Sequence, residues 1–144
     1  IKTYFKRFPG IRAYMDETKA FAKENGFVTT AYGRKINLSG IKSKGPQRSF
    51  AERQAINAPI QGSAADIIKR AMIRMPEALA KAGLSARMLL QVHDELVFEC
   101  PEKEADALID TVKATMQGAA GPALELSVPL VVDARAASNW AEAH

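Results

Sequence analysis

The 144-residue sequence contains little cysteine and little histidine, and these shortages exclude several kinds of site. Its one cysteine, Cys100, cannot form a disulfide within the chain, which favours a reducing compartment. The two histidines, His93 and His144, are too few for a histidine-rich metal centre. The sequence also has no GxxxxGK pattern, so a phosphate-binding loop of that kind is excluded.

Long apolar runs are missing as well. No stretch of 18 or more apolar residues occurs, so we expect no transmembrane helix, and no signal-peptide pattern opens the chain. Hydrophobic residues nevertheless make up 47% of the sequence, which is enough to build a buried core. The chain begins with Ile1, inside what reads as a continuing element, and we therefore expect a fragment of a larger protein.

Charge is distributed unevenly along the chain, although the net charge is only +4. Residues 1–56 contain 12 Lys and Arg against 4 Asp and Glu, a net charge of +8. Residues 57–144 contain 8 against 12, a net charge of −4. A basic first half suggests a polyanionic partner such as nucleic acid, although a surface that is only soluble would give the same pattern. Carboxylates gathered in a phosphate-binding protein favour a bound metal ion.

The first third of the sequence predicts a helix followed by a hairpin. Apolar residues recur at helical spacing, and Asn25-Gly26 supplies a stop signal. The next segment is rich in β-branched and aromatic side chains, which favour strands. The predicted elements are a helix over 11–25, a strand over 27–32, a returning strand over 34–38 and a flexible basic loop over 39–47.

The remaining sequence predicts a long helix, a second hairpin and further elements. Ser49 and Glu52 are spaced as a capping box, so the long helix is expected to begin there and to bend at Pro59, which lacks a backbone N–H. The predicted elements are this helix over 49–79, strands over 87–92 and 96–98, a helix over 105–116 and a strand over 128–132. Their order indicates an α+β fold in which helices cover one side of an antiparallel sheet.

The tip of the second predicted hairpin places two carboxylates next to each other. The strand leading to it is apolar, and we expect Met88, Leu90 and Val92 to share one face. Asp94 and Glu95 repel each other by about 1 kcal/mol or more near a surface, so a bound cation such as Mg²⁺ would stabilise the pair. Because neighbours on a strand point to opposite faces, we expect one ligand and one supporting carboxylate, with another acid from elsewhere. A plain polar turn is the alternative interpretation.

A polar row runs along the predicted long helix. Ser49, Arg53, Asn57 and Gln61 are spaced by four and therefore stay on one side of a helix. The row has one positive charge and no acid, and its side chains can hydrogen-bond to base edges, including acceptors in the minor groove. An ordinary solvated helix face is the alternative, although such a face more often carries Glu and Lys. Arg70, further along the helix, is interpreted as a surface charge.

Several segments resemble the A-family DNA polymerases of bacteria. Residues 91–95, with the sequence Gln-Val-His-Asp-Glu, are similar to motif C of that family. Residues 50–69 resemble the long helix upstream of motif C. The other matching segments are Tyr4–Ile11, Thr30–Lys35 and Asn139–His144. The resemblance covers nearly the whole chain in one register.

The resemblance implies the palm of a right-hand polymerase, with an antiparallel palm sheet that carries the motif C hairpin and is packed by long helices. Residues 1–48 would connect the fingers to the palm, and residues 49–144 would form the C-terminal palm portion. The implied reaction is template-directed transfer of deoxynucleotides to a primer 3′ hydroxyl with two Mg²⁺ ions, in DNA replication and repair. The implied partners are primer–template DNA and deoxynucleoside triphosphates. We further expect a bacterial, cytoplasmic, nucleoid-associated protein that is monomeric and not bound to membranes.

The resemblance also implies roles for individual residues. Asp94 would be the metal ligand of motif C, Glu95 would be the supporting catalytic carboxylate, and His93 would contact the primer end. The residues that would contact the primer–template minor groove are Arg53, Asn57 and Gln61. Because minor-groove acceptors are similar in every base pair, such contacts would check duplex shape without reading sequence.

Two parts that the family needs are not found in this sequence. These are a second metal-binding aspartate upstream and the fingers helix that binds the incoming nucleotide. We therefore expect the chain to start just after that helix, to run to the natural C-terminus, and to have no useful polymerase activity alone. Residues 134–138 depart from the more glycine-rich turn of the family, which leaves the path of this loop open.

Two other functions compete with the polymerase interpretation. A non-catalytic primer–template DNA-binding module would explain the basic half but would gain nothing from Asp94 beside phosphate. A metal-dependent nuclease would need several more clustered acids. Asp106 and Asp110 are spaced by four on a predicted helix, but they flank an apolar face and are interpreted as solvated.

Overall fold

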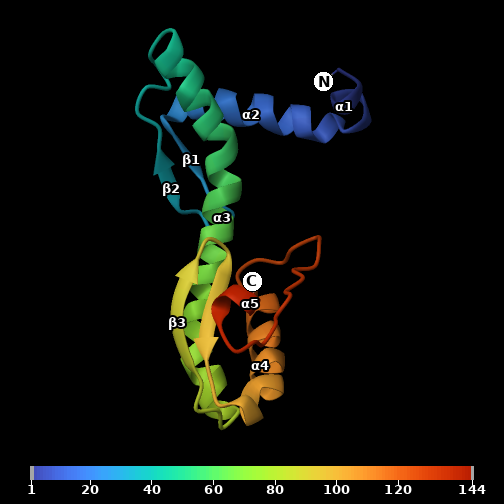
Figure 1. The fold of residues 1–144 in the computed structure, drawn as a ribbon. Helices are drawn as coiled ribbons and strands as arrows, with labels where there is room; N and C mark the ends of the chain where they lie inside the picture. Colours follow the sequence, from blue (N-terminus) through green and yellow to red (C-terminus); the bar gives the residue numbers. More distant parts are fainter. Residues whose placement is uncertain (1, 144) are drawn as a thin grey trace. The chain divides into compact units, whose positions relative to one another are not determined.

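The computed structural model describes residues 2–143, and the chain divides into two compact units, one ending at Ser63 and the other beginning at Ala64. Each unit contains a two-stranded antiparallel sheet and a core of its own, and the α+β fold class is confirmed. The elements, drawn in Figure 1, are α1 (Lys2–Arg7), α2 (Pro9–Asn25), β1 (Phe27–Thr29), β2 (Lys35–Asn37), α3 (Pro46–Lys81), β3 (Arg87–Val92), β4 (Glu95–Glu99), the 3₁₀ turn η1 (Glu102–Glu104), α4 (Ala105–Gln117) and α5 (Trp140–Ala143).

The first unit is built around small residues on α3. Gly26 adopts a left-handed conformation with φ of 80° and ends α2, so the predicted stop signal is confirmed. Strand β1 then pairs with β2, as the sequence predicts, although both strands are shorter than expected. The buried core of this unit consists of Ala22, Val28, Leu38, Ile41, Ala51 and Ala55. The two alanines of α3 leave room for the hairpin to lie close to the helix.

Helix α3 begins three residues earlier than predicted. Its first residue is Pro46, whose missing N–H costs nothing in the first turn because that turn has no intrahelical acceptors for it. The expected capping box at Ser49 is therefore wrong: Ser49 lies inside the helix, and its hydroxyl donates to the carbonyl of Gly45, which precedes the helix, at 3.4 Å. The helix continues through Pro59 to Lys81, and the expected bend at Pro59 stays a prediction. Among the described residues, no helix is both long and apolar enough to cross a membrane.

The second unit packs the β3–β4 hairpin onto α4 and the later part of α3. Its core comprises Met75, Leu79, Leu108 and Val112, with Met88, Leu96 and Phe98 among the side chains packed against it. The pairing register shifts between Met88 and Leu90, as at a β-bulge. The expectation that Met88, Leu90 and Val92 share one face is therefore wrong, because an extra residue reverses the alternation of side chains. Met88 pairs with Phe98 on the core side, whereas Leu90 remains 42% exposed.

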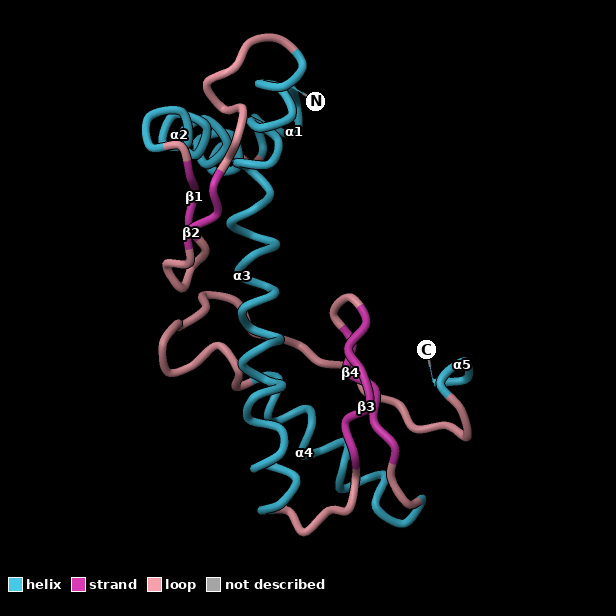
Figure 2. Tube along the Cα trace, turned by 90° about the vertical axis from the view of Figure 1, so that its left-hand side faces the viewer, coloured by secondary structure: helices cyan, strands magenta, loops and turns pink. Residues whose placement is uncertain are grey.

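The predicted strand over 128–132 is not formed. Figure 2 shows the segment between α4 and α5 as loop, and Val128 and Val131 are 66% and 77% exposed. The composition of this segment favours a strand, but a strand requires a hydrogen-bonding partner, and the described sheets are the two separate pairs β1–β2 and β3–β4. The expectation of one helix-covered sheet is corrected to two hairpins.

Two arginines of α3 bind the turn that follows α4. The Arg70 guanidinium donates to the carbonyls of Ala119 at 3.0 Å and Gly121 at 3.1 Å. Arg74 donates to the carbonyls of Gly118 at 3.0 Å and Gly121 at 2.5 Å. Cations near a helix C-terminus also interact favourably with its dipole. The interpretation of Arg70 as a surface charge is therefore wrong, since it is half-buried and fixes the end of α4.

Candidate nucleic-acid and metal sites

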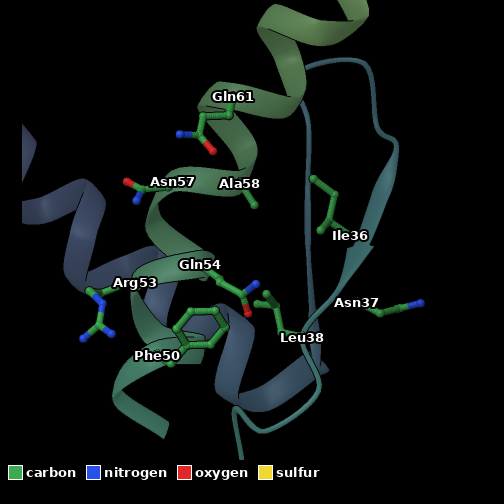
Figure 3. Close-up of a pocket in the computed structure, with 9 residues that line it drawn as sticks. All are labelled: Ile36, Asn37, Leu38, Phe50, Arg53, Gln54, Asn57, Ala58 and Gln61. Atoms are coloured by element: carbon green, nitrogen blue, oxygen red, sulfur yellow. The ribbon is translucent and has the colours of Figure 1, made fainter. Parts of the chain in front are cut away.

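The polar row of α3 borders a pocket in the first unit. The pocket has a volume of about 300 Å³ and lies between α3 and the second strand of the β1–β2 hairpin (Figure 3). Arg53, Asn57 and Gln61 line it, as predicted for side chains on one side of the helix, whereas Ser49 does not. The remaining lining residues are Ile36, Asn37, Leu38, Phe50, Gln54 and Ala58.

The three row residues lie on one exposed side of α3. Figure 3 shows Arg53, Asn57 and Gln61 projecting from the same side of α3, while Ala58 points toward Ile36. All three are solvent-exposed. They present one guanidinium and two amides, which together offer several donors for base and sugar acceptors of a nucleic acid. The row can therefore donate hydrogen bonds to an external partner without first losing buried contacts.

Among the pocket residues that sequence reasoning did not assign to a site, Gln54 and Phe50 add to its chemistry. Gln54 adds a third amide, and Phe50 is 55% exposed with the Arg53 guanidinium 5.9 Å from its ring centroid. Such a cation–π contact restricts the arginine to a narrower set of orientations. The signal was present in the spacing, because positions three and four apart are neighbours on a helix and Phe50 precedes Arg53 by three.

Neighbouring elements contact the backbone of α3 beside the row. The Tyr14 hydroxyl of α2 donates to the Ile56 carbonyl at 2.8 Å. From the tip of the β1–β2 hairpin, the Arg34 guanidinium donates to the Gly62 carbonyl at 3.1 Å. The Ala31 amide donates to the Ser63 hydroxyl at 2.8 Å. The helix backbone is therefore anchored next to Asn57 and next to Gln61.

The carboxylates of the second unit lie at the tip of the β3–β4 hairpin. His93 and Asp94 form a two-residue turn, closed by the pairing of Val92 with Glu95. His93 has φ of 53°, a left-handed conformation that is uncommon for residues other than glycine. The Gln91 side-chain amide donates to the His93 carbonyl and so bridges the turn. Asp94 is exposed at this turn, and Glu95, at the start of β4, is half-buried.

Glu95 lies on the face of the hairpin that does not carry the core. Directly paired residues of an antiparallel hairpin share a face, so Glu95 lies with Val92, and Leu96 lies with Gln91 on the core side. The Asp94 side chain extends from the turn, before β4 begins. The two carboxylates are therefore adjacent in sequence, but Asp94 extends from the turn and Glu95 from the first residue of β4. Their roles as one metal ligand and one supporting carboxylate stay predictions.

Both carboxylates line a groove of about 890 Å³ in the second unit. The rest of the lining comes mainly from β4, including Glu99, from apolar residues of α4 and from the segment 131–140. Carboxylate oxygens are the donors that Mg²⁺ prefers, so the residues present fit such an ion. Within residues 2–143 no group of three or more His, Cys, Asp or Glu side chains is arranged to bind a metal. The second metal-binding aspartate stays a prediction about the longer protein.

The family model of DNA polymerase family A matches residues 1–142. DNA polymerase I of Rhizobium leguminosarum is 56% identical over 147 residues, which cover 100% of this chain and 14% of that protein. DNA polymerase I of Pseudomonas aeruginosa is 52% identical over 145 residues, covering 100% of this chain and 15% of that protein. The chain thus spans about one seventh of the length of these curated relatives.

A solved structure has a similar fold. It is the POL domain of Pol1 from M. smegmatis in complex with a DNA primer–template and dNTP. Its TM-score is 0.79 and its sequence is 47% identical, over 88% of this chain and 22% of that chain. Sequence and fold therefore point to the same group of proteins.

Proposed function

Because the chain belongs to DNA polymerase family A, we propose that it supplies a C-terminal part of the palm of a right-hand DNA polymerase. The longer protein would carry out template-directed DNA synthesis on a primer. The observation that carries this proposal is the exposed two-residue turn that presents Asp94 beside Glu95 within a motif C sequence. A turn built only to reverse the chain has no need for two adjacent acids, which repel each other.

In the proposed reaction the primer 3′ oxygen forms a bond to the α-phosphorus of a deoxynucleoside triphosphate, and the bond to the pyrophosphate leaving group breaks. Bound Mg²⁺ ions would stabilise charge on the attacking and leaving oxygens. Asp94 would bind metal together with an aspartate upstream of this chain. Glu95 would support that carboxylate electrostatically, and His93 would contact the primer end.

The polar row of α3 would bind the primer–template duplex. Arg53, Asn57 and Gln61 would donate hydrogen bonds to minor-groove acceptors, which occur at similar positions in every base pair. The net charge of +8 on residues 1–56 would attract the phosphate backbone in a salt-dependent way. This combination suits an enzyme that must bind any correctly paired duplex.

The domain roles follow from the same proposal. Residues 1–48 would link the fingers to the palm, and residues 49–144 would form the palm portion. The isolated chain would lack the upstream aspartate and the nucleotide-binding fingers helix, and we expect it to be inactive. We also propose a monomeric protein that acts in replication and repair at the bacterial nucleoid.

The test uses the longer polypeptide that contains this chain. We expect Asp94→Ala to lower Mg²⁺-dependent primer extension by several orders of magnitude and to leave primer–template affinity within a few-fold. Asp106→Ala is the matched control, because Asp106 is an exposed carboxylate of the same unit on α4 and should leave both measurements unchanged. Extension that survives Asp94→Ala would overturn the assignment. A wild-type protein that binds primer–template but never extends it would indicate a DNA-binding module instead.

A further inference from the structure

Helix α3 has a weak point inside the polar row. Pro59 lies between Asn57 and Gln61 and has no backbone N–H, so the carbonyl of Ala55 receives no hydrogen bond from position 59. Helices commonly bend or open at such a position. The direction of the Gln61 side chain therefore depends on what fixes the helix just after the proline.

The tip of the β1–β2 hairpin supplies that support. Arg34 donates to the Gly62 carbonyl at 3.1 Å, and the Ala31 amide donates to the Ser63 hydroxyl at 2.8 Å. The Ser63 hydroxyl in turn donates to the carbonyl of Pro59 at 2.5 Å. These bonds connect the hairpin tip to both sides of position 61. We call this set of residues the hairpin–helix contact.

Gly62 makes the hairpin–helix contact possible. A Cβ at this position would lie 2.7 Å from Thr30 Cγ2 and 3.0 Å from Ile36 Cδ1. Thr30 is only 4% exposed and β-branched, so its methyl group cannot easily move away. Glycine weakens a helix interior relative to alanine, and its presence here permits the hairpin to approach the helix backbone.

We propose that Arg34 is a positioning residue that fixes the orientation of Gln61 toward the DNA duplex, an inference that rests on the function proposed above. Arg34 acts through the Gly62 carbonyl, one residue from Gln61. Its planar guanidinium limits how the first turn after Pro59 can rotate. Loss of Arg34 leaves Gln61 in place but lets its amide sample orientations in which the minor-groove hydrogen bond is misaligned and weak.

A double-mutant cycle in the longer polypeptide tests this inference. Primer–template affinity is measured by fluorescence anisotropy over a range of salt concentrations for Arg34→Ala, Gln61→Ala and the double variant. We expect Arg34→Ala to weaken binding about three- to tenfold in the wild-type background and less than about twofold in the Gln61→Ala background, since the two residues act through one contact. The dependence of affinity on salt should not change, because no phosphate contact is lost.

A second variant breaks the same contact without replacing Arg34. Because the Thr30 methyl group cannot easily move aside, Gly62→Ala should push the whole hairpin tip off the helix and reproduce the loss of affinity, again with an unchanged salt dependence. Gly62→Ala acts by steric overlap and Arg34→Ala by loss of a hydrogen bond, so the two variants test the inference independently. Arg12→Ala is the control for loss of one arginine charge in the same unit. Arg12 is ion-paired with Asp16 on α2 and takes no part in the hairpin–helix contact.

Each outcome has one meaning. An equal effect of Arg34→Ala in both backgrounds, or a salt slope reduced by about one phosphate contact, would show that Arg34 binds DNA directly and would overturn the inference. Unchanged affinity in both Arg34→Ala and Gly62→Ala would also overturn it. If Gln61→Ala itself has no effect, the minor-groove part of the proposed function fails, and the positioning role fails with it. If Gln61→Ala weakens binding and the effect of Arg34→Ala simply adds to it, the positioning role fails while the proposed function stands.

Discussion

The two units of the chain position their polar groups in different ways. In the first unit the polar row lies on a helix whose backbone is contacted from outside, by Tyr14 of α2 at the Ile56 carbonyl and by Arg34 at the Gly62 carbonyl. In the second unit Asp94 lies on a turn that is bridged from within the same hairpin, by Gln91 at the His93 carbonyl. The position of the polar row therefore depends on α2 and the β1–β2 hairpin as well as α3, whereas the position of Asp94 depends on β3 and β4 alone.

Charge divides in the same way. Residues 57–63 contain no charged side chain, so the division at Ser63 separates a unit of net charge +8 from one of −4. Hydrogen bonds from amides weaken steeply when they are misaligned, so a surface that checks duplex shape needs external support.

The largest expected effect separates the two carboxylates of the tip. We expect Glu95→Gln in the longer polypeptide to lower primer extension about 10- to 100-fold, as is typical for groups that support a metal ligand, and thus far less than Asp94→Ala. Extension rates measured over a range of Mg²⁺ concentrations should show partial recovery of Glu95→Gln at high Mg²⁺. Glu99→Gln is the control, since Glu99 lies on the same strand and pairs with Arg87 at 2.6 Å. Equal losses for Asp94 and Glu95 would mean that both bind the ion.

A second prediction asks whether the units unfold separately. Met75 and Val28 are the largest fully buried side chains of the second and the first unit, respectively. Met75→Ala should destabilise its unit by about 2–5 kcal/mol, and Val28→Ala by about 1–3 kcal/mol because fewer atoms are removed. Hydrogen exchange should then quicken in β3, β4 and α4 for Met75→Ala, and in α2, β1 and β2 for Val28→Ala. Faster exchange in every element for both variants would show a single cooperative unit and would remove the basis of the comparison.

Local features of the fold could be predicted from the sequence, because their causes are local. The glycine at position 26 ends α2 through its own left-handed conformation, and both hairpins follow from short turns between strand-forming segments. The start of α3 was missed because Ser49 offers a capping pattern, whereas Pro46 offers an equally good first residue. The bulge next to Leu89 was not predictable, since alternation in the sequence does not reveal an extra residue in one strand.

Contacts between distant residues could not be predicted. The strand expected over 128–132 has a favourable composition, but strand formation depends on a partner that composition does not supply. The sequence indicates a surface charge at Arg70, because its partner, the Ala119 carbonyl in the turn after α4, is 49 residues away in the sequence. The candidate site residues were found from side-chain chemistry, spacing and resemblance, and their roles stay predictions. The hairpin–helix contact joins positions 28 residues apart, and no spacing rule covers that distance.

The smallest expected effect tests whether the His93 side chain contributes to the stability of the turn. His93 has φ of 53°, which glycine adopts without strain, so His93→Gly relieves strain in the folded turn but adds entropy to the unfolded chain. These changes oppose each other, and we expect the free energy of unfolding to change by less than about 1 kcal/mol. Extension from a primer terminus should fall nonetheless, because the proposed imidazole contact with the primer end is lost. Asn tolerates the left-handed region and keeps a polar side chain, so the extension rate of His93→Asn should lie between those of the wild type and His93→Gly. Denaturant unfolding measures the change in stability, and extension kinetics on the same preparations measure the loss of the primer contact. A loss of several kcal/mol in His93→Gly would instead show that the imidazole itself stabilises the turn, in addition to the contact from the Gln91 side chain.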